Sequence, residues 1–285
     1  MKPPRFDYAR PASLDEAVAL LAASEGDGKP LGGGQSLIPM LNMRFAMPAT
    51  LIDLALVPEL QGIARTHDGR LAIGAGVRHR AAETAPLVRE ACPLLAQALH
   101  HVGHVQIRNR GTVGGSLAHA DPNAELPAVA VALDAELIAC GPDGERAIPA
   151  SEFFRGPYTT ALEEDEILRE VRLPALDGWR TTFQEVARRN GDFALAGVAA
   201  AVRLADDGTI AETRLACVSG GAGPTRLHAA EAALAGGASG PEACTAAGAA
   251  ARAQLAADGD DDPEQDYRRA LVETLVARAL EEVAA

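Results

Sequence analysis

Two glycine-rich segments carry the residue types and spacing that could bind an anionic group. The first glycine segment, residues 30–39, contains three consecutive glycines, which can adopt positive φ angles at little steric cost. Such turns can direct several backbone N–H groups into one concavity, so that an anion binds without a basic side chain. The second glycine segment, residues 110–116, places Gly114 and Gly115 between Thr112 and Ser116. Two such segments suit a diphosphate, and we expect their backbone N–H groups to supply most of its recognition.

Neither segment matches the common phosphate-binding motifs. The sequence has neither the Gly-Lys-Ser/Thr ending of a P-loop nor the Gly-x-Gly-x-x-Gly spacing of a dinucleotide-binding turn at these places. Taken singly, either segment could be an ordinary tight turn. Ser36 adds a hydroxyl that could also cap a short helix over residues 37–41, where Pro39 is tolerated in the first turn.

Short helices and strands must position these segments. Ser13 and Glu16 have the spacing of a capping box, which predicts a helix that begins there and ends at residues 24–26. A longer helix is expected over residues 82–101. Strands are expected at residues 50–54, 70–77 and 167–173. Residues 128–140 fit a helix or a strand and enter a strand near Ala135, and a turn at residues 141–144 predicts a hairpin.

The composition changes after about residue 175, which predicts a domain boundary there. Strands are expected next, at residues 181–186, 195–204 and 210–218, and helices follow at residues 224–235, 241–256 and 263–283. With a smaller break near residue 56, the chain divides into residues 1–56, 57–175 and 176–285. The acidic run at residues 258–262 is interpreted as a solvated linker, because it lacks the spaced ligands of a calcium loop.

Composition and charge exclude several classes of protein. The 285 residues include 39 Asp and Glu against 26 Lys and Arg, so the formal net charge of −13 disfavours nucleic acids and anionic membranes as partners. No run approaches the roughly 20 apolar residues of a membrane helix, so we expect no membrane span and a cytoplasmic protein. Four scattered cysteines without Cys-x-x-Cys spacing predict small buried side chains and no iron–sulfur cluster held by this chain.

Longer stretches around the two glycine segments resemble a known family. Residues 32–39 and 106–122 are similar to the FAD-binding medium subunit of molybdenum hydroxylases, a family that includes aerobic carbon monoxide dehydrogenase and bacterial xanthine dehydrogenase. The likeness covers nearly the whole chain, with supporting pieces at residues 73–77, 166–168 and 188–193. It implies an α+β fold, with a vanillyl-alcohol-oxidase-type FAD-binding domain of two subdomains and a C-terminal α+β domain.

The resemblance also implies which residues contact FAD. The pyrophosphate and neighbouring groups would be bound by Leu31, Gly32, Gly33, Gly34, Gln35, Ser36 and Leu37. Closing on them would be Thr112, Val113, Gly114, Gly115 and Ser116. Val102 would flank the cofactor, Asp121 and Glu125 would lie near ribose or ribityl hydroxyls, and Leu168 would pack near the adenine or the ring. Gln184 or Glu185, with Asp192 and Phe193, would lie by the isoalloxazine edge and face.

Three of these positions depart from the family pattern. Relatives often carry a lysine at or beside residue 184, where this chain has Gln184 and Glu185, so the redox tuning of the flavin is open. Phe193 can cover a ring but has no hydroxyl. Glu125 stands where aspartate is common, with a longer reach and the same charge.

Other polar residues have simpler interpretations. His100, His101 and His104 are expected at a helix end rather than in a metal site, since no third ligand is evident. His119 could pack or form hydrogen bonds. Arg108 and Arg110 could touch a cofactor phosphate, a partner subunit or surface carboxylates, and Trp179 is expected to pack between domains.

The family implies an electron-transfer flavoprotein. A partner large subunit with a molybdopterin cofactor would oxidise the substrate, and a small subunit with two [2Fe–2S] clusters would pass electrons to FAD here and on to an external acceptor. No residue of this chain need act as a catalytic acid or base, and a dimer of heterotrimers is expected. The alternatives are a standalone flavin oxidase, which needs a pocket histidine, tyrosine or arginine beside the flavin, and a non-redox nucleotide-binding or scaffold protein.

Overall fold

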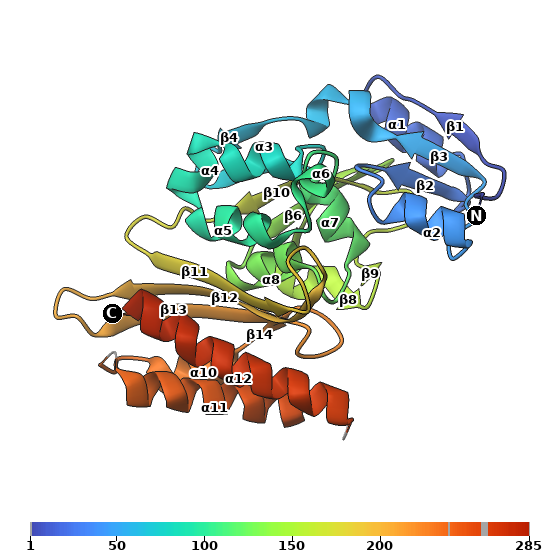
Figure 1. Cartoon of the computed structure of the whole chain (residues 1–285). Helices are drawn as coiled ribbons and strands as arrows, with labels where there is room; N and C mark the ends of the chain where they lie inside the picture. The colour runs from blue at the N-terminus through green and yellow to red at the C-terminus, as the bar shows by residue number, and fades with distance from the viewer. Residues whose placement is uncertain (1, 239, 258–261, 285) are drawn as a thin grey trace.

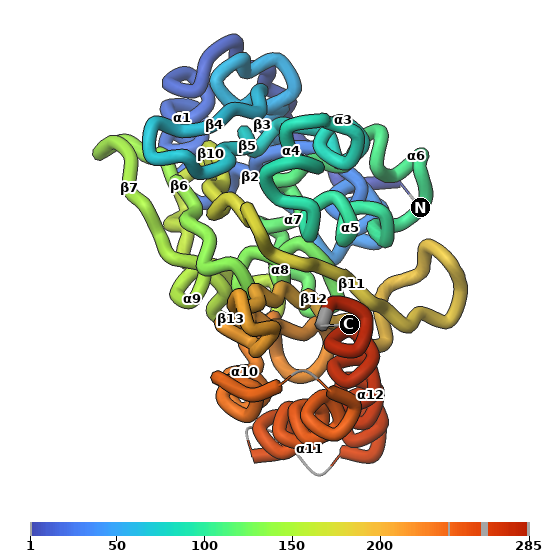
Figure 2. Tube along the Cα trace, turned by 90° about the vertical axis from the view of Figure 1, so that its left-hand side faces the viewer, coloured from blue at the N-terminus to red at the C-terminus, as the bar shows by residue number. Residues whose placement is uncertain are grey.

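The computed structural model describes residues 2–238, 240–257 and 262–284. Within these residues, three larger sheets follow one another along the chain and through the molecule, and helices pack between and below them (Figures 1 and 2). A fourth sheet has only two short strands. The α+β class expected from the sequence is confirmed. Of the acidic run at residues 258–262, all but Asp262 lies outside the described residues.

The first sheet is small and parallel. Its strand order is β1 (Asp7–Ala9), β3 (Thr50–Asp53) and β2 (Gly28–Leu31). Helix α1 (Leu14–Ala22) begins at Ser13, whose hydroxyl accepts a hydrogen bond from the N–H of Glu16 at 3.2 Å. The Glu16 carboxylate accepts from the N–H of Ala12 rather than of Ser13, so the predicted cap forms with a shifted return bond. The first glycine segment leaves β2 and enters α2 (Leu37–Met43).

The second sheet is antiparallel and five-stranded. Its order is β4 (Ile63–Arg65), β5 (Leu71–Gly74), β10 (Ile167–Leu173), β6 (Glu136–Gly141) and β7 (Gly144–Pro149). The expected hairpin is present, with Gly144 at a φ of 109° in the turn between β6 and β7. The ambiguous run at residues 128–140 holds the end of α8 (Glu125–Ala132) and then most of β6. The short elements of this region are η1 (Leu54–Leu56), η2 (Pro58–Leu60), α9 (Ala150–Phe153), β8 (Phe154–Gly156) and β9 (Thr159–Thr160).

The single helix expected over residues 82–101 is wrong. Three helices occupy this stretch: α3 (His79–Thr84), α4 (Pro86–Ala91) and α5 (Pro93–His101). Pro86 and Pro93 each stand at the first helical position, because proline has no N–H to donate to the preceding turn. Two further helices, α6 (Val105–Arg108) and α7 (Val113–His119), lead through the second glycine segment.

The third sheet is covered on both faces. Its order is β11 (Arg180–Ala187), β12 (Ala194–Leu204), β13 (Ile210–Val218) and β14 (Thr225–Arg226). Helices α5 and α8 lie on one face, and α10 (His228–Leu234) and α12 (Pro263–Ala284) lie on the other with α11 (Pro241–Ala257) beside them (Figure 1). The helix expected over residues 224–235 therefore begins only at His228, after a short strand.

Burial explains the alanine-rich strand β12. Every residue from 196 to 202 is buried, because helices cover both faces, and small side chains let these helices approach closely. Trp179 packs against the same core, with the guanidinium groups of Arg203 and Arg214 5.8 and 5.1 Å from its ring. All four cysteines are buried, as predicted. Among the described residues, no helix combines the length and apolar character needed to cross a membrane.

Candidate functional site

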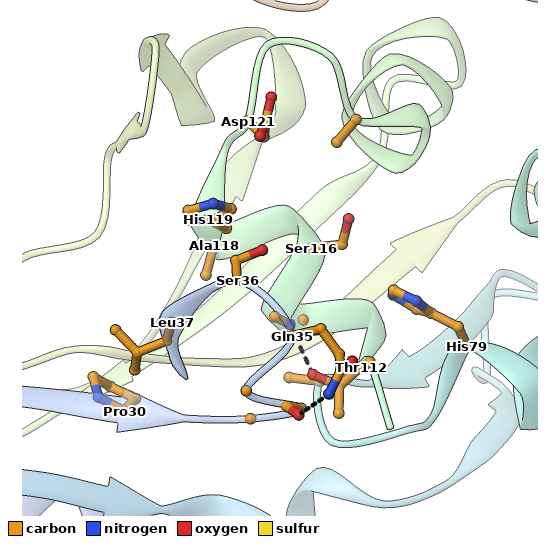
Figure 3. A pocket seen from close by; sticks show the side chains of 18 of the residues that line it. Pro30, Gln35, Ser36, Leu37, His79, Thr112, Ser116, Ala118, His119 and Asp121 are labelled. Carbon is orange, nitrogen blue, oxygen red and sulfur yellow. Dashed lines mark hydrogen bonds between the residues drawn. The ribbon is translucent and has the colours of Figure 1, made fainter. Parts of the chain in front are cut away.

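A cavity of about 530 Å³ lies where the first two sheets meet (Figure 3). Both glycine segments line it, together with β10, the start of α8 and the loop between β11 and β12. Most of the residues expected to contact FAD are brought together on its wall: Gly32, Gly33, Gly34, Gln35, Ser36, Leu37, Val102, Thr112, Gly114, Gly115, Ser116, Asp121, Glu125, Leu168, Asp192 and Phe193. The fold thus gathers residues from four separate parts of the chain.

Three expected contact residues, Leu31, Val113 and Gln184, do not line this cavity, and neither does Glu185, the alternative to Gln184. Leu31 ends strand β2. Val113 is buried in the core at the start of α7, and its N–H donates to the carbonyl of Val77 at 2.9 Å. Gln184 faces the helical layer, where its side-chain amide donates to Glu282 at 2.8 Å.

The two glycine segments are in direct contact. A Cβ added at Gly33 would lie 2.4 Å from the carbonyl oxygen of Arg110 and 2.6 Å from the Cα of Gly111. A Cβ at Gly32 would lie 2.8 Å from the hydroxyl oxygen of Thr112. Glycine is therefore required at both positions, because the first segment lies against the backbone of the second segment and against the capping hydroxyl of Thr112. The two turns together form one wall of the cavity.

The first glycine segment presents a row of unused donors. Within the described part of the chain, no hydrogen-bond acceptor pairs with the backbone N–H groups of residues 33–37. Ser36 makes no capping bond with its side chain, contrary to the cap expected there, and its hydroxyl lines the cavity. Gln35 donates from its side chain to the carbonyl of Gly33 at 3.2 Å, which fixes the turn (Figure 3). Consecutive free N–H groups on a cavity wall form an anion site.

The second glycine segment differs from the expectation. Its N–H groups are used inside the protein: Gly114 donates to the Ala75 carbonyl at 2.9 Å, and Gly115 donates to the Thr112 hydroxyl at 3.0 Å. The N–H of Ser116 donates to the Thr112 carbonyl at 3.0 Å, as the first turn of α7 forms. The idea that both segments share the N–H recognition of a diphosphate is therefore wrong. The second segment instead supplies close approach and hydroxyl groups.

Asp121 is held by a small polar cluster at one side of the cavity. This carboxylate is 7% exposed and accepts from the N–H and the side-chain amide of Asn123 at 2.9 and 3.2 Å. The Tyr158 hydroxyl donates to it at 3.4 Å, and the rings of Tyr158 and His119 lie 5.1 Å apart. The sequence did not indicate Tyr158 as a site residue, because it lies in the connection between β8 and β9, where no motif is present.

Glu125, at the start of α8, and Glu185, in β11, are carboxyl groups with raised pKa values. Glu125 lines the cavity although it is only 6% exposed. Burial raises the pKa of Glu125 to about 8, and the nearby charge of Glu185 adds to the effect. Burial also raises the pKa of Glu185 to about 7. The Oε2 atom of Glu185 is buried without a hydrogen-bond partner among the described residues.

His79 is another cavity residue that the sequence did not single out. It is 5% exposed, and burial lowers its pKa to about 4, so its ring is neutral at pH 7. The backbone N–H of His79 donates to the carbonyl of Gly111 at 2.9 Å, which ties α3 to the second glycine segment. The only sequence signal was its position two residues after the supporting piece at residues 73–77.

Arg108 has a structural role. Its side chain is buried, contacts the Glu83 carboxylate at 3.1 Å, and donates to the carbonyls of Val102 and Gly103 at 3.1 and 2.8 Å. Burial alone would raise the pKa of Glu83, but hydrogen bonds from Arg80 and His100 and the charge of Arg108 outweigh burial and hold it below its usual value. This network fixes the turn that carries Val102 against the cavity.

The histidines near this turn do not form a metal site. His100 belongs to α5 and contacts Glu83, whereas His104 precedes α6, so they do not share one helix face. No cluster of metal-binding side chains occurs within residues 2–238, 240–257 and 262–284. A Cβ added at Gly191 would lie 2.4 Å from the His104 ring, so the loop that carries Asp192 and Phe193 rests on this histidine. Phe193 is 65% exposed at the cavity edge.

Comparison with known proteins gives the family. Residues 4–176 match the model of the FAD-binding domain in molybdopterin dehydrogenase, and residues 181–283 match the C-terminal domain of the CO dehydrogenase flavoprotein. The carbon monoxide dehydrogenase medium chain of Hydrogenophaga pseudoflava is 40% identical over 283 residues, covering 98% of this chain and 97% of the relative. The nicotine 6-hydroxylase medium subunit of Paenarthrobacter nicotinovorans is 40% identical over 287 residues, covering 100% of this chain and 99% of the relative.

A solved structure extends the likeness to the fold. The structure of carbon monoxide dehydrogenase from Hydrogenophaga pseudoflava that lacks the Mo-pyranopterin moiety of its cofactor matches with a TM-score of 0.94 and 41% identity. The match covers 99% of this chain and 98% of the compared chain. Fold and cavity therefore define an FAD-binding flavoprotein of the oxidoreductase class. The chain belongs to the family of FAD-binding medium subunits of molybdopterin dehydrogenases, as its resemblance indicated.

Proposed function

We propose that this chain binds FAD in the cavity and passes electrons from the [2Fe–2S] clusters of a partner subunit through FAD to an external acceptor. The observation that carries the proposal is the row of backbone N–H groups at residues 33–37 on the cavity wall, which have no acceptor in the described part of the chain. A diphosphate satisfies several such donors at once, and burial of the site strengthens each bond. FAD supplies two-electron chemistry, and the protein supplies binding, orientation and electrostatics.

Different residues of this chain bind different parts of the cofactor. The first glycine segment holds the diphosphate, and the contact of Gly33 with Gly111 shapes the wall against which it lies. Asp121, already fixed by Asn123 and Tyr158, accepts hydrogen bonds from sugar hydroxyls. Leu168 supplies apolar surface, and Phe193 covers the exposed side of the ring system.

We propose that the chain has two domains. The FAD-binding domain covers residues 1–175, with subdomains at 1–56 and 57–175, and the C-terminal domain covers residues 176–285.

The relatives' names, medium chain and medium subunit, support the presence of further subunits. We propose a molybdopterin-binding large subunit and a [2Fe–2S] small subunit in a dimer of heterotrimers. Because the four cysteines of this chain are buried and unpaired with one another, we assign the iron–sulfur clusters to a partner subunit.

Titration of the purified full-length chain with FAD tests the proposal. We expect quenching of flavin fluorescence with FAD, and much weaker binding of FMN and riboflavin, which lack the diphosphate bridge. A folded chain that leaves FAD fluorescence unchanged would contradict FAD binding.

The electron route needs the complex. With the chain co-expressed with its partner subunits, substrate should reduce the iron–sulfur clusters and then the flavin. Reduction of flavin by a small substrate in the isolated chain would instead support the standalone oxidase, for which His119 and Tyr158 provide cavity side chains.

A further inference from the structure

A serine of the third sheet is hydrogen-bonded to the loop that carries Asp121. Ser219 follows strand β13 directly and is only 3% exposed. Its backbone N–H donates to the carbonyl of Pro122 at 3.2 Å, and its hydroxyl donates to the side-chain oxygen of Asn123, 96 residues earlier in the chain, at 2.6 Å. Neither Asn123 nor Ser219 lines the cavity, so Ser219 acts on a bound cofactor only through other residues.

The side-chain amide of Asn123 connects Ser219 to Asp121. Asp121 follows helix α7 on the cavity wall (Figure 3), and its Oδ1 atom accepts from the backbone N–H and the side-chain amide of Asn123 at 2.9 and 3.2 Å. A carboxylate only accepts hydrogen bonds, so the NH₂ end of the amide must face Asp121 and its oxygen must face away. The Ser219 hydroxyl donates to that oxygen and thereby holds the amide in this orientation.

The backbone of Ser219 has the left-handed conformation that glycine favours. Its φ angle is 61°, and the next two residues of the chain are glycines. Serine in this conformation carries a backbone cost that glycine would avoid. What serine adds is the hydroxyl, which lies 2.6 Å from the Asn123 oxygen and 3.2 Å from the carbonyl oxygen of Ala194. Because a hydroxyl has one hydrogen to donate, the shorter contact is the principal hydrogen bond.

We propose that Ser219 is a positioning residue for the cofactor: through Asn123 it fixes the Asp121 carboxylate in the orientation that accepts hydrogen bonds from the sugar hydroxyls of FAD. The inference rests on the proposed function, in which Asp121 binds those hydroxyls. Asn123 holds the Oδ1 atom, and the Tyr158 hydroxyl donates to Oδ2 at 3.4 Å, so both carboxylate oxygens are oriented before FAD binds. A side chain that is already ordered loses less conformational entropy on binding. The third sheet thus contributes to FAD affinity from outside the cavity.

A second route from Ser219 to the cavity leads through Ala194. This residue begins strand β12 and directly follows Phe193 at the cavity edge. The contact of the Ser219 hydroxyl with the Ala194 carbonyl is the longer of the two, and Phe193 is 65% exposed whereas Asp121 is 7% exposed. The geometry therefore favours the route through Asn123, and the experiment separates the two routes.

The experiment measures the FAD dissociation constant of the full-length chain for wild type, Ser219→Gly, Asp121→Ala and the double variant. Ser219→Gly removes the hydroxyl and suits the left-handed backbone, so the chain should unfold at nearly the wild-type denaturant concentration. Its FAD affinity should fall about threefold to tenfold, as expected for one hydrogen bond. Asp121→Ala should weaken FAD binding about tenfold to a hundredfold. In the Asp121→Ala background, Ser219→Gly should change affinity by less than about twofold, because the residue through which it acts is absent.

Glu25→Gly is the matched control. Glu25 has a φ angle of 50°, is exposed and does not line the cavity, so this variant makes the same backbone change and should keep wild-type FAD affinity. An unchanged affinity in Ser219→Gly or in Asp121→Ala would overturn the inference.

The double variants decide between the two routes. A loss from Ser219→Gly that is equally large with and without Asp121 would overturn the inference. If that loss disappeared instead in a Phe193→Ala background, the effect would belong to the route through Ala194. A folded wild-type chain that binds no FAD would contradict the proposed function itself.

Discussion

The substitution Gly33→Ala tests how the cavity is built, because it adds one methyl group where the two glycine segments touch. The new Cβ would lie 2.4 Å from the Arg110 carbonyl oxygen, whereas ordinary contact begins near 3.4 Å, so the segments must separate by about 1 Å. Both nearest obstacles, this oxygen and the Cα of Gly111, are backbone atoms that cannot rotate away. We expect the free energy of unfolding to fall by about 1–3 kcal/mol, the usual cost of overpacking. A displacement of this size should weaken FAD binding by about tenfold to a hundredfold.

Two measurements check this prediction. Chemical unfolding gives the stability of the chain without flavin, and quenching of flavin fluorescence gives the dissociation constant of FAD. Gly223→Ala is the matched control, because no atom lies within 4 Å of its added Cβ and its φ angle is not in the positive range. If Gly33→Ala kept both wild-type stability and wild-type affinity, the contact between the segments would not shape the site.

Three further predictions follow from single contacts. Ser36→Ala should change the free energy of unfolding by less than about 0.5 kcal/mol, because the Ser36 hydroxyl makes no capping hydrogen bond. The same substitution should change FAD affinity by less than about tenfold. A larger loss of stability in denaturant unfolding, or of affinity in an FAD titration, would contradict this prediction. Arg108→Ala should cost about 3–5 kcal/mol at pH 7, because it leaves Glu83 buried without its buried partner. Because the pKa of Glu83 lies below 4.5, that stabilisation should disappear in wild type as pH falls below this value, and urea unfolding across pH measures it. The raised pKa of Glu125 makes the folded chain bind more protons than the unfolded chain between about pH 4.5 and 8, so stability should fall with rising pH by up to about 1.4 kcal/mol per unit. Glu125→Gln should reduce this dependence of the free energy of unfolding on pH. An unchanged dependence would mean that a group other than Glu125 titrates in this range.

The sequence predicted elements well where local patterns decide them. The capping residue of α1, the hairpin between β6 and β7, and the long helix α12 depend on nearby residues, and they formed as expected. The prediction of one helix over residues 82–101 failed because it rested on apolar periodicity and not on Pro86 and Pro93. Proline ends each helix there whatever the spacing of the leucines.

The candidate site was harder to predict because its properties depend on tertiary contacts. Which N–H groups remain free cannot be read from glycine spacing, since the second segment gives its donors to Ala75 and Thr112. Gln184 and Glu185 show a second limit. Adjacent residues of a strand point to opposite faces, and both faces of this sheet are covered, so the sequence alone could not say which of the two side chains bonds to the helical layer.

The contact of Gly33 with Gly111 also has a consequence for the order in which the molecule becomes rigid. The three-stranded sheet at residues 7–53 has short strands and little core of its own, so it depends on docking against the rest of the chain. A cofactor held across that junction stabilises the docked state, by about 2.7 kcal/mol when its free concentration is a hundred times the dissociation constant. Amide hydrogen exchange at the N-terminus should slow when flavin is supplied. Riboflavin starvation would then leave cells with chains whose first fifty residues are open to proteases.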